Sequence, residues 1–431
     1  MSEASYPRFR WFMLITLGFA TMNTSIIMIS FAPLMGDIAK NLGLNLGAAT
    51  GAFMGVFNLV IATCCLLGGF LCDRYGVVPV FFVGHVIMIL SSLAFPLFAQ
   101  SFGPAMLIRI VQAFGMGPIL ATASPVAAQW FPEKERGIVL GIQGMTVSLG
   151  IAVGFIAAPA AFAGTGSWQA TMAWLTIPYF AGLVLIAVAS FGPKSPVQFS
   201  CGEGNKLASD AHDYKLALQQ PVTWLGLLLV FCLCWILSAF NDLTPAYIAI
   251  DSPIGIGYGR MTAGKLMMAL QIAFMVGAVV SGFIMQKVFK GSARPVIMIG
   301  YMLEAAFCTS IMWPAVYSSV GALLIFLITI GFFMAWPVPN ALAFVSMHYP
   351  PGIAGKIGGM WLGIGLYGGS IGIIVGSIAL HRTGNYQTSI IIVSILALIG
   401  LILSAFLKPP KIFCVTDEGA AGDRVEKKFG V

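Results

Sequence analysis

The sequence predicts an all-α membrane protein with twelve transmembrane helices, arranged as two six-helix bundles related by pseudo-twofold symmetry. Three observations predict this fold. Of the 431 residues, 59% are hydrophobic and only 9% are charged, whereas a soluble globular protein carries about 25% charged residues. Twelve apolar stretches are long enough to cross a bilayer. Segments of the first half of the chain also recur in the second half.

The shortage of charge excludes two classes of protein. A soluble enzyme of this length needs a polar surface that these residues cannot supply, and a disordered chain has a much lower apolar content. The eight cysteines lack the spacing of a zinc site or a redox motif, so we interpret them as small hydrophobic residues. The net charge of +7 is explained by basic residues in cytoplasmic loops, and it does not indicate nucleic-acid binding.

The apolar stretches give the order of the helices. Each stretch ends at charged residues or at a Pro/Gly-rich segment. The predicted spans cover residues 10–35, 46–71, 78–99, 101–130, 136–162, 168–192, 221–250, 261–287, 293–313, 316–347, 352–380 and 384–407. We expect an N-terminal six-helix bundle over residues 1–192, a cytoplasmic linker at 193–220, a C-terminal six-helix bundle over 221–407 and a cytoplasmic tail at 408–431.

The distribution of basic residues predicts the orientation of the chain. With both termini in the cytoplasm, 17 of the 22 Lys and Arg residues lie inside, four lie outside, and Arg109 falls within a span. Because cytoplasmic loops of membrane proteins accumulate Lys and Arg, this bias favours cytoplasmic termini. We expect a multi-pass protein of the bacterial cytoplasmic (inner) membrane.

An internal repeat relates the two halves. Pro33 in the first span corresponds to Pro245 in the seventh, Gly69 to Gly282, and the pair Phe131-Pro132 to Tyr349-Pro350. The offsets are 212, 213 and 218 residues. Six spans repeated in parallel orientation are typical of transporters whose halves rock about a central site.

Two motifs resemble signatures of the major facilitator superfamily. The segment GFLCDRYG at residues 69–76 resembles the family's Gly-x-Leu-x-Asp-Arg-x-Gly loop, and RIVQAFG at 109–115 resembles its Arg-x-x-Gln-Gly motif, with Ala113 in place of glycine. Two features depart from the family pattern. Val77-Val78-Pro79 follows the loop where basic residues are usual, and the fifth span lacks the Gly-Pro-x-x-Gly-Gly pattern of proton-coupled drug antiporters.

The resemblance implies a cytoplasmic gate formed by Gly69, Asp73, Arg74 and Gly76. An aspartate at the inner end of the second span can approach the N-terminus of a helix in the other half, where the helix dipole favours negative charge. The alternative is that Asp73 and Arg74 belong to a solvated loop.

Asp242 and Glu304 are the two acidic residues that the sequence places within spans. An ionisable group at the bilayer centre costs roughly 2.5–3.5 kcal/mol on insertion scales, which makes it a functional candidate. We expect proton coupling through one of them, with Asp242 preferred, because the seventh span lines the cavity in similar proteins. The alternatives are an outer-gate salt bridge for Asp242 and a structural hydrogen bond for Glu304.

Arg109 is the candidate for recognising an anion. Its planar guanidinium can bind a carboxylate or phosphate through two hydrogen bonds. The alternative is that Arg109 holds the N-terminal bundle together, as the family motif often does.

Polar residues in the expected cavity helices are candidates for binding substrate. They are Asn23, Gln143, Asn241, Gln271, Trp336 and Asn340. The segment from Trp336 to Asn340 contains two prolines and should break the tenth span, and broken helices often mark binding sites. Each of these residues could instead serve as a polar contact between helices.

These observations predict a secondary active transporter that works by alternating access and is not an enzyme. Its expected partners are a small-molecule substrate, the lipid bilayer and a coupling proton, with the substrate a small organic anion moved by symport. No P-loop occurs in the sequence, so we expect neither a nucleotide nor another cofactor, and no metal or nucleic acid. The alternatives are a non-transporting receptor or assembly factor on the same fold and an exporter of drugs or metabolites.

Overall fold

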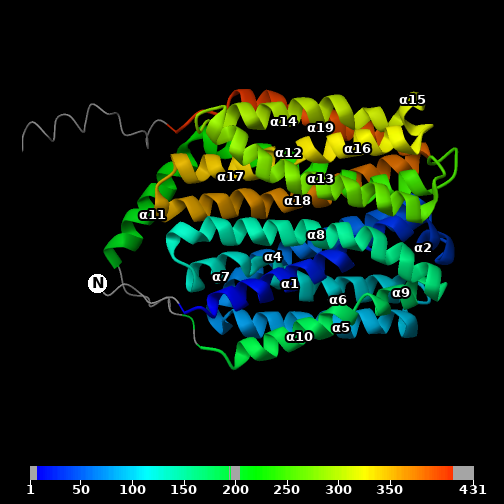
Figure 1. The fold of residues 1–431 in the computed structure, drawn as a ribbon, viewed down its shortest axis with the longest axis horizontal. Helices are drawn as coiled ribbons and strands as arrows, with labels where there is room; N and C mark the ends of the chain where they lie inside the picture. The colour runs from blue at the N-terminus through cyan, green and yellow to red at the C-terminus, as the bar shows by residue number, and fades with distance from the viewer. Residues whose placement is uncertain (1–6, 194, 196–203, 411–431) are drawn as a thin grey trace, which may run out of the picture.

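The computed structural model of the chain describes residues 7–193, 195 and 204–410. Within these ranges the side chains of residues 73, 133, 134, 137, 138, 204–211, 351 and 352 lie outside the description. Every regular element in the described ranges is a helix (Figure 1).

The N-terminal half contains ten α-helices and two short irregular helical turns. They are α1 (Arg10–Ile29), the 3-10 turn η1 (Ala32–Leu34), α2 (Met35–Asn41), α3 (Leu46–Thr50), the π-helical turn η2 (Gly51–Val56), α4 (Phe57–Tyr75), α5 (Val77–Phe98), α6 (Phe102–Ala121), α7 (Ala123–Trp130), α8 (Glu133–Thr165), α9 (Trp168–Trp174) and α10 (Ile177–Ser190). The helix α11 (Gly204–Gln219) lies in the expected linker and runs across one end of the molecule (Figure 1).

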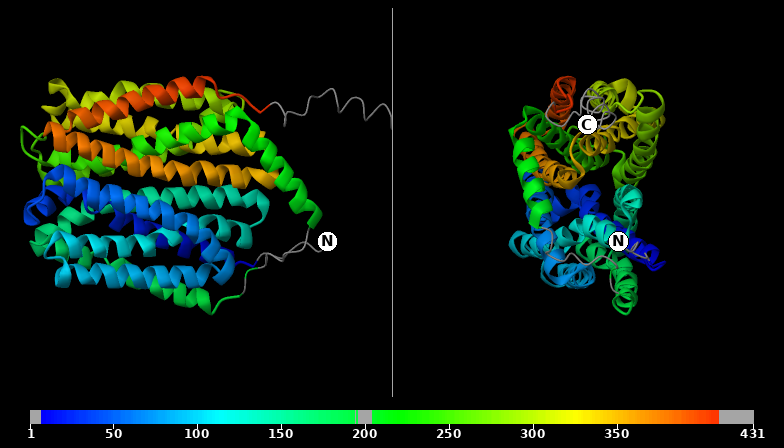
Figure 2. Two further views of the ribbon diagram at one scale, coloured as in Figure 1. Left: turned by 180° about the vertical axis from the view of Figure 1, so that it is seen from behind. Right: turned by 90° about the vertical axis from the view of Figure 1, so that its left-hand side faces the viewer.

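The C-terminal half repeats this plan. It consists of α12 (Pro221–Ala249), α13 (Gly259–Lys287), α14 (Ala293–Cys308), the 3-10 turn η3 (Thr309–Met312), α15 (Pro314–Tyr317), α16 (Val320–Met334), α17 (Pro337–His348), α18 (Pro351–Thr383) and α19 (Gln387–Ala405). The start of α1, α11 and the end of α19 lie at one end of the molecule, here called the terminal face. The helices α2, α9 and α15 lie at the opposite end, the far face (Figures 1 and 2).

Twelve helical segments are long and apolar enough to cross a membrane, which confirms the predicted number of spans. The first span differs from the prediction, because it continues through η1 and α2 to Asn41 and not to residue 35. Asp37 therefore lies within a candidate span, so the prediction that only Asp242 and Glu304 are acids of the spans was wrong. The helix α1 ends at Ile29, and Pro33 lies in the first turn of the short 3-10 turn that leads into α2.

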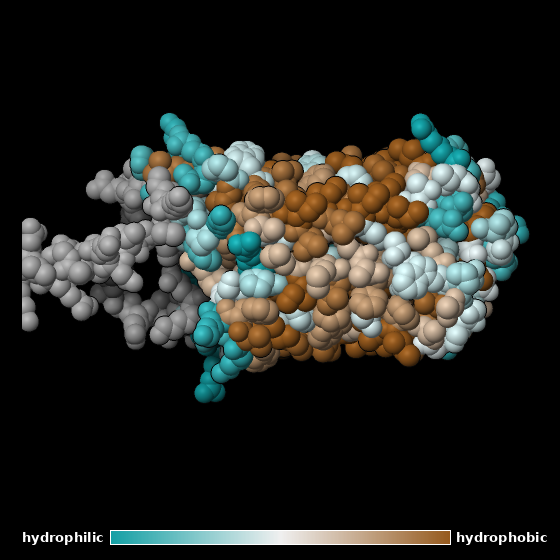
Figure 3. All heavy atoms as spheres, turned by 90° about the horizontal axis from the view of Figure 1, so that it is seen from above, coloured by the Kyte–Doolittle hydropathy of each residue, from teal (hydrophilic) through white to brown (hydrophobic). Residues whose placement is uncertain are grey.

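The predicted break in the tenth span is confirmed. The helix α16 ends at Met334, and α17 starts at Pro337, which occupies a first-turn position where its missing N–H is not needed. The helix α4 ends at Gly76, whose φ of +84° favours glycine. On the face shown in Figure 3, apolar residues cover the middle of the molecule and polar residues gather toward both ends, as expected for a protein that spans a bilayer.

Glycines allow one helix pair in each half to pack closely. In the N-terminal half, Gly150 and Gly154 of α8 lie against α1, where an added Cβ would collide with the backbone of Met22 and with Ile29. In the C-terminal half, Gly368 and Gly372 of α18 lie against Phe231 and Trp235 of α12 in the same way. The two glycine pairs are 218 residues apart, so the internal repeat is also a repeat of helix packing.

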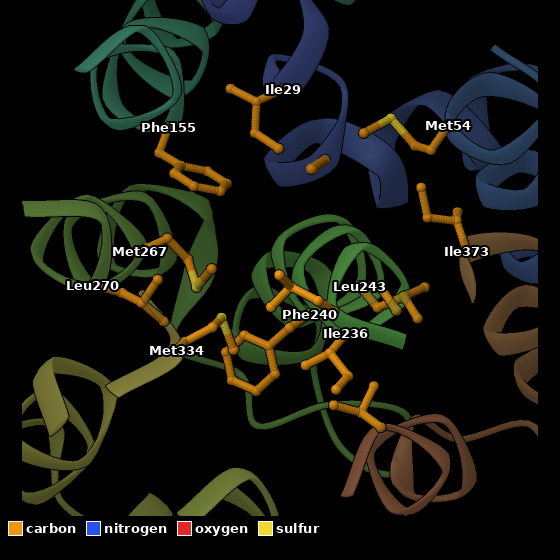
Figure 4. Packing of buried hydrophobic residues seen from close by; sticks show 14 of the residues in the cluster. Ile29, Met54, Phe155, Ile236, Phe240, Leu243, Met267, Leu270, Met334 and Ile373 are labelled. Carbon is orange, nitrogen blue, oxygen red and sulfur yellow. The ribbon is translucent and has the colours of Figure 1, made fainter. Parts of the chain in front are cut away.

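The two halves share one hydrophobic core where they meet. Ile29, Met54 and Phe155 of the N-terminal half face Leu243, Met267 and Ile373 of the C-terminal half (Figure 4). The main contacts between the halves join α8 with α13, α18 with the segment α3–η2–α4, and η1 with α12. Spans 5 and 8, 2 and 11, and 1 and 7 therefore form the boundary at which a transport site would lie.

Candidate transport site

The halves approach each other most closely toward the far face. Gly47 of α3 lies against the backbone of Ser377 and His381 in α18, and Gly264 of α13 lies against the backbone of Phe155 in α8. A Cβ at Gly36 would lie 3.3 Å from the Ile250 side chain. These contacts close the boundary at this end.

The spans are more open toward the terminal face. A Cβ added at Gly69 of α4, Gly141 of α8, or Gly355 or Gly359 of α18 would meet no atom of the described residues within 4 Å. Spans 2 and 11 are joined nearer the middle by Thr63 and Tyr367, whose hydroxyls are 3.1 Å apart, and a Cβ at Gly363 would lie 3.0 Å from the Leu66 side chain. The described conformation is therefore closed at the far face.

Arg109 is fully buried in the N-terminal half. Its guanidinium donates hydrogen bonds to the carbonyls of Phe53 (3.2 Å), Ile27 (3.4 Å) and Met28 (2.9 Å) and to the Gln112 side chain (3.0 Å). It also lies between two aromatic rings, 3.9 Å from the centroid of Phe31 and 3.4 Å from that of Phe57. In this conformation Arg109 connects spans 1 and 2 to span 4, in agreement with the alternative that it holds the N-terminal bundle together. Direct contact between Arg109 and an anion stays a prediction.

Asp242 is a buried acid at the boundary between the halves. It lies on α12 and is 5% exposed. When it is ionised, its charge would attract Arg109 of the other half. Within the described part of the chain it forms no salt bridge and accepts no side-chain hydrogen bond. Asp242 and Arg109 are therefore an ionisable acid and a base on the two halves, without a direct contact among the described residues.

Glu304 lies deeper in the C-terminal half. It is 0% exposed, and neither carboxylate oxygen has a hydrogen-bond partner among the described residues. Its neighbour Tyr301 donates a hydrogen bond of 2.8 Å to the carbonyl of Leu229 in α12, and the Tyr301 ring packs on Gly400 of α19. Glu304 is therefore among α12, α14 and α19, away from the other half.

Most of the predicted substrate contacts are paired with their own half in this conformation. Gln271 donates to Asn241 (2.7 Å), Asn340 donates to Ser281 (3.0 Å), and Asn23 donates to the carbonyl of Pro178 (3.2 Å). These bonds are the helix-to-helix contacts that the sequence left as the alternative.

Some of the predicted contacts keep unused polar groups. The side-chain oxygen of Asn23 is buried without a partner among the described residues. The indole N–H of Trp336 is buried without a partner among the described residues. Gln143 is half-buried on α8, and its side chain forms no hydrogen bond within those residues.

The predicted gate residues lie at the terminal face. Arg74 is exposed, with its guanidinium 5.4 Å from the ring centroid of Tyr75. Gly69 has open space beside it, and Gly76 ends α4. Asp73 is in α4, but its side chain lies outside the described residues. The gating role of these residues stays a prediction.

Sequence reasoning missed one ion pair between the halves. Arg260 at the start of α13 donates to Asp37 of α2 over 2.8 Å, and it also lies over the ring of Phe162 in α8. The basic-residue count placed Arg260 outside the membrane, but no sequence pattern joins it to an acid 223 residues away.

Comparison with known proteins gives the family. The sequence model of the Major Facilitator Superfamily matches residues 13–293. The probable sulfoacetate transporter SauU of Cupriavidus necator is 24% identical, covering 83% of this chain and 85% of its own. The cis,cis-muconate transport protein of Acinetobacter baylyi is 25% identical, covering 76% and 78% respectively. The multidrug transporter AQR1 of Candida glabrata is 28% identical over 45% of this chain and 35% of its own.

A solved structure shares the fold. A bacterial homologue of the human lysosomal transporter Spinster, in an inward-facing and occupied conformation, has a TM-score of 0.73 at 12% identity, covering 95% of this chain and 98% of its own. The family match over most of the chain agrees with the twelve spans and the repeated six-helix plan. The chain belongs to the Major Facilitator Superfamily, whose members bind small-molecule substrates and cross the lipid bilayer.

Proposed function

We propose that this protein is a secondary active transporter that carries a small organic anion together with protons by alternating access. The proposal places it in the cytoplasmic membrane with both termini in the cytoplasm. The observation that carries it is the pair of buried charges at the boundary, Arg109 in the N-terminal half and Asp242 in the C-terminal half.

The pair provides a physical reason for proton coupling. When Asp242 is ionised, its charge offsets the field of Arg109, and a substrate anion gains little by approaching the boundary. When Asp242 carries a proton, the positive field of Arg109 is left uncompensated and attracts an anion, strongly so where water is excluded. Proton binding then favours anion binding, and by thermodynamic linkage the anion favours proton binding to the same extent.

Direct contact between the substrate and Arg109 requires a rearrangement. The guanidinium now donates to three backbone carbonyls and to Gln112. We infer that the anion is first attracted by the field and takes over some of these donors only when spans 1 and 2 move.

Two relatives support an anionic substrate. Two relatives that align over three quarters or more of this chain are named as transporters of sulfoacetate and cis,cis-muconate. Both compounds are small organic anions. The second candidate function, export of drugs or metabolites, is favoured by the similarity to AQR1 over less than half of the chain. Uptake of labelled carboxylates and sulfonates, compared with export of lipophilic cations from the same vesicles, distinguishes the two.

The coupling role of Asp242 is tested with Asp242→Asn in proteoliposomes. We expect this variant to lose accumulation driven by a proton gradient and to keep exchange of labelled for unlabelled substrate, because asparagine cannot release a proton. Glu304→Gln is the matched control, since Glu304 is equally buried but lies away from the boundary, and it should keep both activities. If both variants still accumulate substrate, neither acid couples transport, and a uniporter or an anion exchanger replaces the proposal.

A further inference from the structure

We propose that Arg260 is an outer recognition site for the anionic group of the substrate, and that Asp37 occupies this site while the far face is closed. The inference rests on the proposed function, because it assumes an anionic substrate. This second site lies at the far face, whereas the Asp242 and Arg109 pair of the proposed function lies inside the molecule.

A cavity of about 540 Å³ lies between the halves at the far face. The N-terminal half contributes α2 and the residues around it, and the C-terminal half contributes the end of α12 and the loop before α13. Its charged lining residues are Asp37, Lys40, Asp251 and Arg260. The Asp37 and Arg260 side chains are 31% and 40% exposed, so solutes can reach the pair from this face.

Arg260 makes two side-chain contacts with the opposite half. Asp37 accepts its hydrogen bond at 2.8 Å, and the guanidinium carbon lies 4.4 Å from the ring centroid of Phe162. Both partners belong to the N-terminal half, whereas Arg260 belongs to the C-terminal half. When the halves separate at the far face, Arg260 loses both contacts and faces the widening gap.

Arg260 already binds a carboxylate in this conformation, that of Asp37. The Asp37 carboxylate is bound where the carboxylate or sulfonate of a substrate would bind, and a guanidinium fits either group through its planar fork. Arg260 is in the first turn of α13, a helix of 29 residues with no acid in that turn, and the dipole at a helix N-terminus also favours an anion.

Two properties make the exchange selective. A partly exposed ion pair is weak, so a substrate anion can compete with Asp37 for Arg260. The same cavity contains Lys40 and Asp251, which balance each other in charge. Recognition therefore requires contact with Arg260 and does not follow from a general positive field.

The experiment compares two variants that break the same ion pair. In proteoliposomes of the full chain, the KM of a labelled carboxylate or sulfonate that the parent transports is measured from the far face for Arg260→Gln and Asp37→Asn. Both substitutions remove the ion pair between the halves, and Arg260→Gln also removes the contact of the guanidinium with the Phe162 ring. Only Arg260→Gln removes the anion site, and we expect it to raise KM about tenfold, which is typical for one charge-assisted contact. Asp37→Asn removes the competitor and should lower KM.

The remaining outcomes separate this inference from the proposed function. Lys265→Gln, which removes an exposed cation one turn further along α13 and outside the cavity, should leave KM within about twofold. If Arg260→Gln and Asp37→Asn change KM equally and in the same direction, Arg260 is only a gate contact and the inference is overturned while anion transport stands. If the parent transports and binds no organic anion, the proposed function fails and the recognition site fails with it.

Discussion

At the scale of single residues, Arg109 shows how a cation is stabilised inside a helix bundle. Three of its hydrogen bonds go to backbone carbonyls in spans 1 and 2, near Pro33 and the π-helical turn η2. Irregular backbone at membrane depth is tolerated where another group satisfies it. The guanidinium therefore stabilises a local backbone geometry as well as carrying a charge.

Arg109→Lys should destabilise the protein as well as impair transport. Lysine keeps the charge but presents its donors from one atom, so it cannot reach carbonyls on two helices and Gln112 together. Losing two charge-assisted hydrogen bonds at about 1.5–3 kcal/mol each corresponds to a fall in melting temperature of roughly 5–10 °C. A thermal unfolding curve of the purified variant in detergent measures this. An unchanged melting temperature with weakened anion binding would instead assign Arg109 to the substrate.

The sequence predicted which charged residues lie inside the spans, but it did not predict which groups they contact. A charge in an apolar span can be recognised from composition alone, which identified Arg109, Asp242 and Glu304. The hydrogen-bond or ion-pair partner of each charged group depends on contacts between segments that are distant in the sequence. The pair of Asp37 and Arg260 is one example. Asn241 and Gln271 had the right chemistry for a ligand, but their mutual hydrogen bond follows from the packing of α12 on α13.

At the scale of helices, the packing of α18 on α12 depends on missing side chains. A Cβ at Gly368 would collide with the carbonyl of Phe231, and a Cβ at Gly372 would contact the Trp235 ring. The four-residue spacing of these glycines puts both on the same face of α18, and that face is the one that contacts α12. The π-helical turn η2 had no comparable sequence signal, because one extra residue in a helical turn leaves the apolar pattern nearly unchanged.

Gly368→Ala should lower the melting temperature, whereas Gly359→Ala on the same helix should not. Overpacking against a backbone costs about 1–3 kcal/mol, which corresponds to several degrees. At Gly359 the added methyl meets no described atom within 4 Å, and alanine favours the helix by about 1 kcal/mol. Thermal unfolding of both variants under one condition measures the difference. Equal melting temperatures would mean that α12 and α18 can separate without cost.

At the scale of the whole molecule, the repeat and the number of spans could be predicted, but the conformation could not. The offsets between the halves indicated two similar bundles, and the glycine pairs 218 residues apart show that their packing is alike. Closure at the far face depends on weak contacts between the bundles, such as the partly exposed pair Asp37 and Arg260. Two arrangements that differ by a few weak contacts share one sequence pattern, so the pattern cannot select between them.

Alternating access predicts that a covalent link across the far face stops transport. The test variant combines Gly36→Cys and Ile250→Cys. A Cβ at residue 36 would lie 3.3 Å from the Ile250 side chain, so two cysteines at these positions can form a disulfide after a small adjustment. Oxidation should hold α2 against the end of α12, abolish substrate uptake in proteoliposomes, and be reversed by a reductant. The two single-cysteine variants, oxidised in the same way, control for the native cysteines; four of the six in the described ranges are buried. Uptake that continues in the fully cross-linked protein would mean that the halves do not part at this face, and substrate would then have to cross by another route.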